Sequence, residues 1–239
     1  MWEAFDLLQY RMVACKIHQL NPHWSQEKKE NYTKHATREY AIHKSVRHHR
    51  VVRLFDVFEI DLNSFATVLE RCEGPDLDYY LKEKKNLPER EARALLIQIV
   101  SALAYLNGLK NPIIHYDLKP GNILFDGDAQ VKITDFGLSK IIENDGGSGG
   151  AGSVELTSQG AGTYWYLPPE CFRTGDKGQP PKISSKVDVW SVGVIFYQTL
   201  YVEVHSHIFS SHTHTHTHTH TNTPDTERNR SVMVCHRIN

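Results

Sequence analysis

Apolar and polar residues alternate along much of the first part of the chain, which is the spacing of half-buried strands. The pattern predicts strands at residues 12–18, 51–60 and 65–71, with a turn at residues 61–63 between the last two. Residues 21–34 are polar and predict a connection. A helix is predicted after it from residues at helical spacing: Ala36, Tyr40, Ile42, His43 and Val46.

Gly74-Pro75 predicts a break in chain direction, and beyond it the pattern becomes mainly helical. Apolar residues recur there at i, i+3, i+4 and i+7, so the longest helix has one buried face. The predicted elements are a helix at residues 77–84, a helix from Pro88 to Leu106, short strands at residues 123–125 and 131–134, and a central buried helix at residues 187–200.

Composition narrows the possibilities only slightly. The 239 residues are 40% hydrophobic, enough for a substantial core, and the formal net charge of -1 gives no field that would attract nucleic acid. The N-terminus lacks the pattern of a secretory signal, and the longest apolar stretch, residues 187–204, is interrupted by polar side chains. Four scattered cysteines without a CxxC pair favour reduced thiols. We therefore expect an intracellular chain with neither a signal peptide nor a transmembrane segment.

Two segments have biased composition. Residues 143–162 are rich in Gly, Ser and Asp and predict a mobile loop. Residues 201–239 read as a disordered low-complexity tail containing the His-Thr repeat of residues 212–221. Alternating histidines could bind zinc or nickel, although translation of a CA dinucleotide repeat explains the same alternation.

The chemistry-bearing residues are concentrated in two short motifs. The first is His115-Tyr116-Asp117-Leu118-Lys119-Pro120-Gly121-Asn122, and the second is Asp135-Phe136-Gly137. Magnesium-dependent phosphoryl transfer needs an acid at the attacking hydroxyl together with groups that hold metal and phosphate. Two acids, an amide and a lysine at these spacings predict that chemistry.

With these motifs, residues 4–200 resemble a eukaryotic serine/threonine protein kinase domain. The resemblance implies an α+β, bilobal fold with a partial N-lobe at residues 1–73 and a partial C-lobe at residues 74–200, including an activation segment at residues 135–170. It also implies ATP and Mg2+ as cofactors. Val13-Ala14-Cys15-Lys16 resembles the strand whose lysine contacts the ATP phosphates, and Glu39 is the helix acid that would pair with it.

The same resemblance assigns the catalytic roles. Asp117 would accept the proton of the substrate hydroxyl, and Lys119 would offset charge on the transferring phosphoryl group. Asn122 and Asp135 would ligate magnesium through oxygen. Lys119 and the Gly162-Thr163 pair are typical of serine/threonine kinases.

Further site residues are implied around the adenine and in the activation segment. Leu69 falls at the gatekeeper position, and Glu70, Arg71 and Cys72 would form the hinge whose backbone bonds adenine. The remaining assignments are Ala14 and Leu124 on the two adenine faces, and Phe136, Gly137, Thr163 and Glu170 in the activation segment.

Longer strings resemble the Tousled-like kinases in particular, including residues 16–21, 27–32, 114–117 and 156–172. That family is nuclear, acts in chromatin assembly, phosphorylates anti-silencing histone chaperones and oligomerises through a coiled coil. The resemblance therefore implies a nuclear location, those chaperones as substrates and association with full-length relatives. It implies neither direct nucleic-acid binding nor a membrane.

The chain also departs from the family pattern. The first strand and the Gly-rich loop are expected to be missing, and the C-lobe is expected to end after its central helix, which would expose an apolar face. Glu170 would then be a partly buried charge without its arginine. Tyr116 replaces an arginine that grips activation-loop phosphate in many kinases, and it cannot make that charge-assisted contact. Two alternatives to an active enzyme therefore stay open, a noncatalytic interaction module and an unstable fragment.

Overall fold

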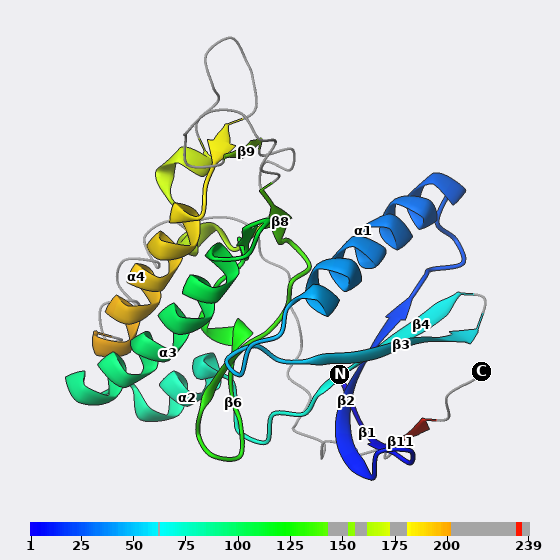
Figure 1. Ribbon diagram of the computed structural model, residues 1–239, viewed down its shortest axis with the longest axis horizontal. Helices are drawn as coiled ribbons and strands as arrows, with labels where there is room; N and C mark the ends of the chain where they lie inside the picture. The colour runs from blue at the N-terminus through cyan, green and yellow to red at the C-terminus, as the bar shows by residue number, and fades with distance from the viewer. Residues whose placement is uncertain (62, 143–152, 156–161, 173–180, 202–232, 236–239) are drawn as a thin grey trace, which may run out of the picture.

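The computed structural model describes residues 1–61, 63–142, 153–155, 162–172, 181–201 and 233–235. Figure 1 shows a lobe of strands with helix α1 beside a lobe that is mainly helical. The predicted α+β, bilobal fold class is confirmed. The His-Thr repeat and most of the Gly-rich segment lie outside the described residues.

The first lobe is a five-stranded sheet in the order β11-β1-β2-β4-β3, accompanied by one helix. The turn between its first two strands is held by the Asp6 carboxylate, which accepts hydrogen bonds from the backbone N–H groups of Leu8 and Gln9. The bounds are β1 (Trp2–Asp6), β2 (Arg11–Gln19), α1 (Gln26–Ser45), β3 (Leu54–Asp61), β4 (Ser64–Glu70) and β11 (Met233–Cys235).

Helix α1 begins well before the point that the sequence pattern predicts, so the expected connection at residues 21–34 is wrong over most of its length. The Ser25 hydroxyl caps the helix by accepting a hydrogen bond from the backbone N–H of Lys28. The first turns are largely exposed, and only Ile42 and His43 of this helix are buried. Without a buried face, the start of the helix produces no apolar periodicity.

Strand β11 pairs in parallel with β1 at the edge of the sheet. The expectation of disorder across residues 201–239 therefore does not hold at Met233–Cys235. The reason is that an edge strand offers free backbone donors and acceptors, which a segment can use without any distinctive side-chain pattern.

The second lobe packs helices against short hairpins. The Asp76 carboxylate caps α2 by accepting from the backbone N–H of Tyr79 at 2.8 Å. The bounds are α2 (Leu77–Lys84), α3 (Glu89–Asn107), β5 (Ile113–Ile114), η1 (Pro120–Asn122), β6 (Ile123–Phe125), β7 (Val131–Ile133), β8 (Lys140–Ile141), β9 (Val154–Glu155), η2 (Tyr164–Tyr166), η3 (Pro169–Cys171), β10 (Lys182–Ile183) and α4 (Lys186–Leu200). Strand β9 pairs with β10, so part of the predicted mobile loop is a short strand.

Helix α4 lies beside α3 in Figure 1 and buries only one side. Val187, Val192 and Ile195 are buried, whereas Val189 and Trp190 are exposed. The predicted central helix is therefore buried on one side only, and the predicted exposed apolar face is confirmed. No helix in the described part of the chain is long and apolar enough to cross a membrane.

One apolar core connects the two lobes. It contains Ile42 of α1, Val46 just after that helix, the α3 face with Leu95 and Ile99, and Ile133 of β7. Phe136, three residues after the end of β7, is completely buried in the same core. Hydrophobic packing therefore holds α1 against the segment that carries Asp135.

Candidate active site

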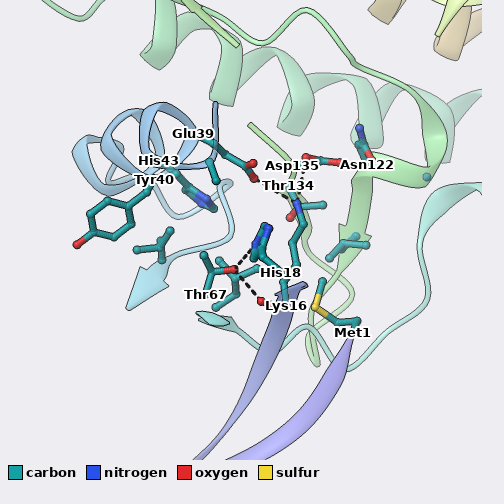
Figure 2. Close-up of a pocket in the computed structure, with 15 residues that line it drawn as sticks. Met1, Lys16, His18, Glu39, Tyr40, His43, Thr67, Asn122, Thr134 and Asp135 are labelled. Atoms are coloured by element: carbon teal, nitrogen blue, oxygen red, sulfur yellow. Dashed lines mark hydrogen bonds and ion pairs between the residues drawn. The ribbon is translucent and has the colours of Figure 1, made fainter. Parts of the chain in front are cut away.

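Lys16 of β2 and Glu39 of α1 form an ion pair between the sheet and the helix, as the sequence predicts. Lys16 Nζ lies 3.3 Å from Glu39 Oε1 and 3.8 Å from Asp135 Oδ1. Figure 2 shows the three side chains converging on one side of a cavity. Burial lowers the pKa of Lys16, but the charges of Glu39 and Asp135 outweigh it and leave that pKa above its ordinary value. Lys16 is therefore a fixed cation.

Asp135 has a left-handed backbone with φ 67°, a conformation that Asp tolerates better than most residues. Its Oδ1 accepts a long hydrogen bond from the Gly137 backbone N–H at 3.3 Å. A Cβ at Gly137 would lie 3.2 Å from Asp135 Oδ1 and 3.3 Å from Glu39 Oε2. Glycine at 137 therefore leaves room for both carboxylates.

Phe136 anchors this turn in the core. Its ring lies between the imidazoles of His43, at 4.8 Å, and His115, at 5.1 Å between ring centroids. The His43 ring is itself held by Val52 O at 2.6 Å. Because Phe136 contacts residues of both lobes, its position links α1 to the loop that carries Asp117.

Asp117 is enclosed by donors. Its Oδ2 accepts from Lys119 Nζ at 2.8 Å and from Asn122 Nδ2 at 3.2 Å. Its Oδ1 accepts from the backbone N–H and the hydroxyl of Thr163, at 3.0 and 2.8 Å. Lys119 Nζ also reaches the Thr163 hydroxyl at 3.1 Å. The four predicted residues thus form one network that fixes the carboxylate.

The loop before Asp117 is held by hydrogen bonds to Asp188 of α4. The Asp188 carboxylate accepts from the backbone N–H groups of His115 and Tyr116 at 2.8 and 2.9 Å. Burial raises the pKa of Asp188, partly offset by His115 and by these two hydrogen bonds. Tyr116 has φ 71°, so these bonds hold a backbone conformation that a bulky residue rarely adopts.

The cavity in Figure 2 has a volume of about 230 Å³ and lies between the lobes. Six of the predicted residues line it: Lys16, Glu39, Leu69, Asn122, Leu124 and Asp135. Asp117 and Lys119 do not line it, but Asn122 does and bonds to Asp117. The catalytic network therefore adjoins the cavity at one end.

Three residues assigned to the nucleotide do not line this cavity: Ala14, Glu70 and Cys72. Ala14 pairs with Leu69 in the sheet, so it lies on the neighbouring strand. The Glu70 side chain turns away, because its Oε1 pairs with Lys132 at 2.9 Å. Burial, and then the charge of Glu70, raises the pKa of Cys72 to about 11, so this side chain stays a neutral thiol at neutral pH.

Asn122 and Asp135 suit a magnesium ion carried by a nucleotide. Asn122 Nδ2 donates to the Asp117 backbone oxygen at 2.8 Å, which turns the amide oxygen away from Asp117. The Asp135 side chain is 42% exposed and can add carboxylate oxygen. Mg2+ is usually held by one or two carboxylates with phosphates and water. No group of three His, Cys, Asp or Glu side chains able to hold a metal occurs among the described residues.

Sequence reasoning missed several residues of the site. His18 and Thr67 line the cavity, and the His18 ring stacks on Phe65 with centroids 4.5 Å apart. Burial, then the charge of Lys16, lowers the pKa of His18 to about 4. The only available signal was position, because His18 lies two residues after Lys16 on the same face of β2.

The remaining activation-segment predictions have mixed outcomes. Thr163 joins the Asp117 network, as described above. Glu170 is exposed, so the predicted partly buried charge is wrong. Its place in the short η3 turn leaves the carboxylate in water.

Tyr116 occupies its own apolar cluster. Its ring is 1% exposed, and burial, then Cys171, raises the pKa of its hydroxyl. A Cβ at Gly162, where φ is 93°, would lie 3.3 Å from Tyr116 Cε1. The tyrosine therefore packs beneath the segment that leads into Thr163.

The chain matches the protein kinase domain family over residues 3–234. It belongs to the protein kinase domain family. Family membership agrees with the order of Lys16, Glu39, Asp117, Asn122 and Asp135 along the chain. All of them except Asp117 line one cavity, and Asp117 bonds to Asn122 of its lining.

Among curated proteins, this kinase is similar to the serine/threonine-protein kinase tousled-like 2 of Xenopus tropicalis and of Homo sapiens, with 64% identity over 204 residues in both. It is 60% identical over 201 residues to the serine/threonine-protein kinase TOUSLED of Arabidopsis thaliana. Each match covers 84% of this chain and 29%, 26% and 28% of the respective relative. The chain thus spans less than a third of the length of these relatives.

Proposed function

We propose that the chain is an ATP- and Mg2+-dependent protein serine/threonine kinase. The observation that carries the proposal is the convergence of Lys16, Glu39 and Asp135 on a cavity whose end is formed by Asn122 of the Asp117 network. Phosphoryl transfer requires mainly positioning and charge stabilisation, and this arrangement supplies both.

Each residue has its own role in the proposed phosphoryl transfer. Glu39 holds Lys16, whose ammonium binds phosphate oxygens. Asp117 receives the proton of a substrate hydroxyl, and Lys119, 2.8 Å away, offsets the charge of the transferring group. When Asn122 and Asp135 bind Mg2+, the ion neutralises phosphate charge.

The acceptor class is supported by Thr163. Its hydroxyl and backbone N–H both donate to the Asp117 carboxylate, which ties the activation segment to the proposed base. The relatives named as serine/threonine-protein kinases support the same class. We infer that protein serine and threonine side chains are the acceptors.

The resemblance to Tousled-like kinases extends the proposal to a nuclear role in chromatin assembly. Anti-silencing histone chaperones are then the substrates, and full-length relatives are partners. The 64% identity over 204 residues to the tousled-like 2 kinases supports this extension. Phosphorylation of a purified anti-silencing chaperone beside an unrelated acidic protein tests it, and equal rates on the two would contradict it.

A single preparation separates enzyme, interaction module and unstable fragment. The purified chain is unfolded in urea, and transfer of the ATP γ-phosphate to a serine-containing protein is measured beside an Asp135→Asn variant. We expect a cooperative transition and activity that Asp135→Asn removes. A folded but inactive chain would support a noncatalytic module, and a chain without a cooperative transition would support a fragment.

A further inference from the structure

A second cavity is lined mainly by the segment that joins α1 to β3. Its volume is about 360 Å³, within the range of about 300–1,000 Å³ that is usual for ligand pockets. It shares no lining residue with the cavity of Figure 2. Besides two valines, its lining consists of Arg47, His48, His49, Arg53, Glu70 and Lys132.

The lining carries an excess of positive charge. Three formal cations face one carboxylate among the described residues that line the cavity, in a chain whose net charge is -1. That carboxylate, Glu70, is already engaged, because its Oε1 pairs with Lys132 at 2.9 Å and its Oε2 accepts from the Arg53 backbone N–H at 3.0 Å. Arg47 and Arg53 are exposed and add charge at the rim.

Lys132 and His48 still have donors to offer a ligand. Lys132 Nζ uses two of its three protons, on Glu70 and on the His49 backbone oxygen at 3.0 Å. His48 Nδ1 faces the Arg50 backbone N–H at 3.2 Å and must be the acceptor, which places the ring proton on Nε2. Burial, then nearby charges from His49, Arg50 and Lys132, lowers the pKa of His48, so the ring is neutral at neutral pH.

We propose that this cavity binds a phosphate group, carried either by a free small molecule or by a phosphorylated serine or threonine of a protein. Phosphate oxygens only accept hydrogen bonds, and the lysine, histidine and two arginines supply only donors. A planar guanidinium can bind two phosphate oxygens at once, which gives Arg47 and Arg53 the main part in affinity.

A ligand at this site would help to hold the predicted catalytic groups in position. The backbone of the cavity wall is bonded to β7, since Ile133 N–H donates to Arg50 O at 2.8 Å and Val52 N–H donates to Ile133 O at 2.9 Å. Asp135 follows two residues after Ile133. The site is nevertheless separate from the proposed active site, because among its lining residues only Glu70 is also assigned to the nucleotide, through its backbone at the hinge.

Inorganic phosphate titrated into the full chain, with the imidazole NMR signals of His48 and His49 as readout, tests the proposal. We compare the chain with an Arg47→Gln/Arg53→Gln variant and with an Arg90→Gln/Arg93→Gln control on the exposed side of α3, at ionic strength matched with chloride. We expect saturable shifts whose midpoint rises about tenfold or more in the cavity variant and is unchanged in the control.

Reading the signal at His48 and His49 excludes phosphate bound near Lys16. Shifts that do not saturate, that chloride reproduces, or that persist with the same midpoint in the cavity variant would overturn the proposal. The variant changes only exposed side chains, and an unchanged amide spectrum checks its fold. A phosphoserine peptide that binds more tightly than inorganic phosphate would assign a protein ligand, whereas equal or weaker binding would assign a free one.

Discussion

Asp117 and Asp135 belong to the same proposed active site but have opposite surroundings. The Asp117 side chain is 9% exposed and accepts four hydrogen bonds from Lys119, Asn122 and Thr163. The Asp135 side chain is 42% exposed and has one long hydrogen bond and an ion pair of 3.8 Å. The side proposed to receive a hydroxyl proton is therefore already organised by protein hydrogen bonds.

The side that meets metal and phosphate leaves oxygen atoms available. This difference has a physical reason, since a carboxylate saturated with protein donors cannot also coordinate a cation. Pre-organised donors cost no rearrangement during the reaction, so they suit the hydroxyl side. We therefore expect substitutions near Asp117 to change the rate of the chemical step. Substitutions near Asp135 should change the affinity for nucleotide.

The largest expected effect comes from Asp117→Asn. We expect the rate of phosphate transfer to fall by about 10²–10⁴-fold because the proton acceptor is lost, while ATP affinity changes little. Initial rates at saturating ATP, with nucleotide binding measured by calorimetry, check both parts. Asp128→Asn, at an exposed position between β6 and β7, is the control. An equal loss in both variants would contradict the assignment.

Asp188→Ala should have the next largest effect, on stability. Two buried backbone N–H groups lose their acceptor, and leaving such groups unsatisfied costs about 1–3 kcal/mol each. We expect the free energy of unfolding in urea to fall by about 2–5 kcal/mol. Asp78→Ala, on the exposed side of α2, should change it by less than about 1 kcal/mol. Similar stabilities for the two variants would show that α4 does not hold the loop that carries Asp117.

His18 should make the stability of the fold sensitive to acid. Its pKa is lowered to about 4 in the fold from an unfolded value of 6.5, so the unfolded chain binds the proton more tightly. Stability is then greatest above pH 6.5 and falls as the pH decreases toward 4, by at most about 2 kcal/mol after solvent screening.

A non-titrating replacement isolates the part of this effect that belongs to His18. His43 also has a pKa lowered by burial, so the comparison must be between variants across the same pH range. Denaturation at pH 7 and pH 5 should show a smaller loss for His18→Gln than for the unsubstituted chain. His23→Gln, on an exposed loop, is the control. A His18→Gln chain with the same pH dependence as the control would rule out this histidine as the source.

Glu39→Gln should have the smallest effect on stability. The pair with Lys16 is partly exposed, and such pairs contribute less than about 1 kcal/mol. ATP affinity should still fall by several-fold, about three- to tenfold, because Lys16 loses the acid that orients it. Fluorescent nucleotide binding measures the change, and Glu27→Gln at the exposed start of α1 serves as its control. Unchanged affinity would indicate that Asp135 alone positions the lysine.

The elements with a clear apolar pattern could be predicted from the sequence. Strand β2 and helix α2 lie almost where alternation and helical spacing place them. The start of α1 could not be found, because a polar, exposed helix face carries no such signal. The pairing of β11 with β1 depends on backbone hydrogen bonds between residues far apart in the chain, which no local pattern encodes.

The site residues could likewise be predicted only in part. Motif spacing identified Lys16, Asp117 and Asp135, because phosphoryl transfer constrains residue type and order together. It did not reveal His18 on the cavity wall or the contact of Tyr116 with Gly162, since both depend on which side chains meet in three dimensions. It also missed the direction of the Glu70 side chain, which Lys132 sets from β7.

The most direct test of the difference between the two acids is ATP binding measured with and without Mg2+ in three chains. These are the unsubstituted chain, Asp117→Asn and Asp135→Asn. We predict that Mg2+ strengthens ATP binding in the first two by about tenfold or more and has little effect in Asp135→Asn. Equal enhancement by Mg2+ in all three chains would contradict the account, because the exposed carboxylate of Asp135 would then have no part in holding the metal.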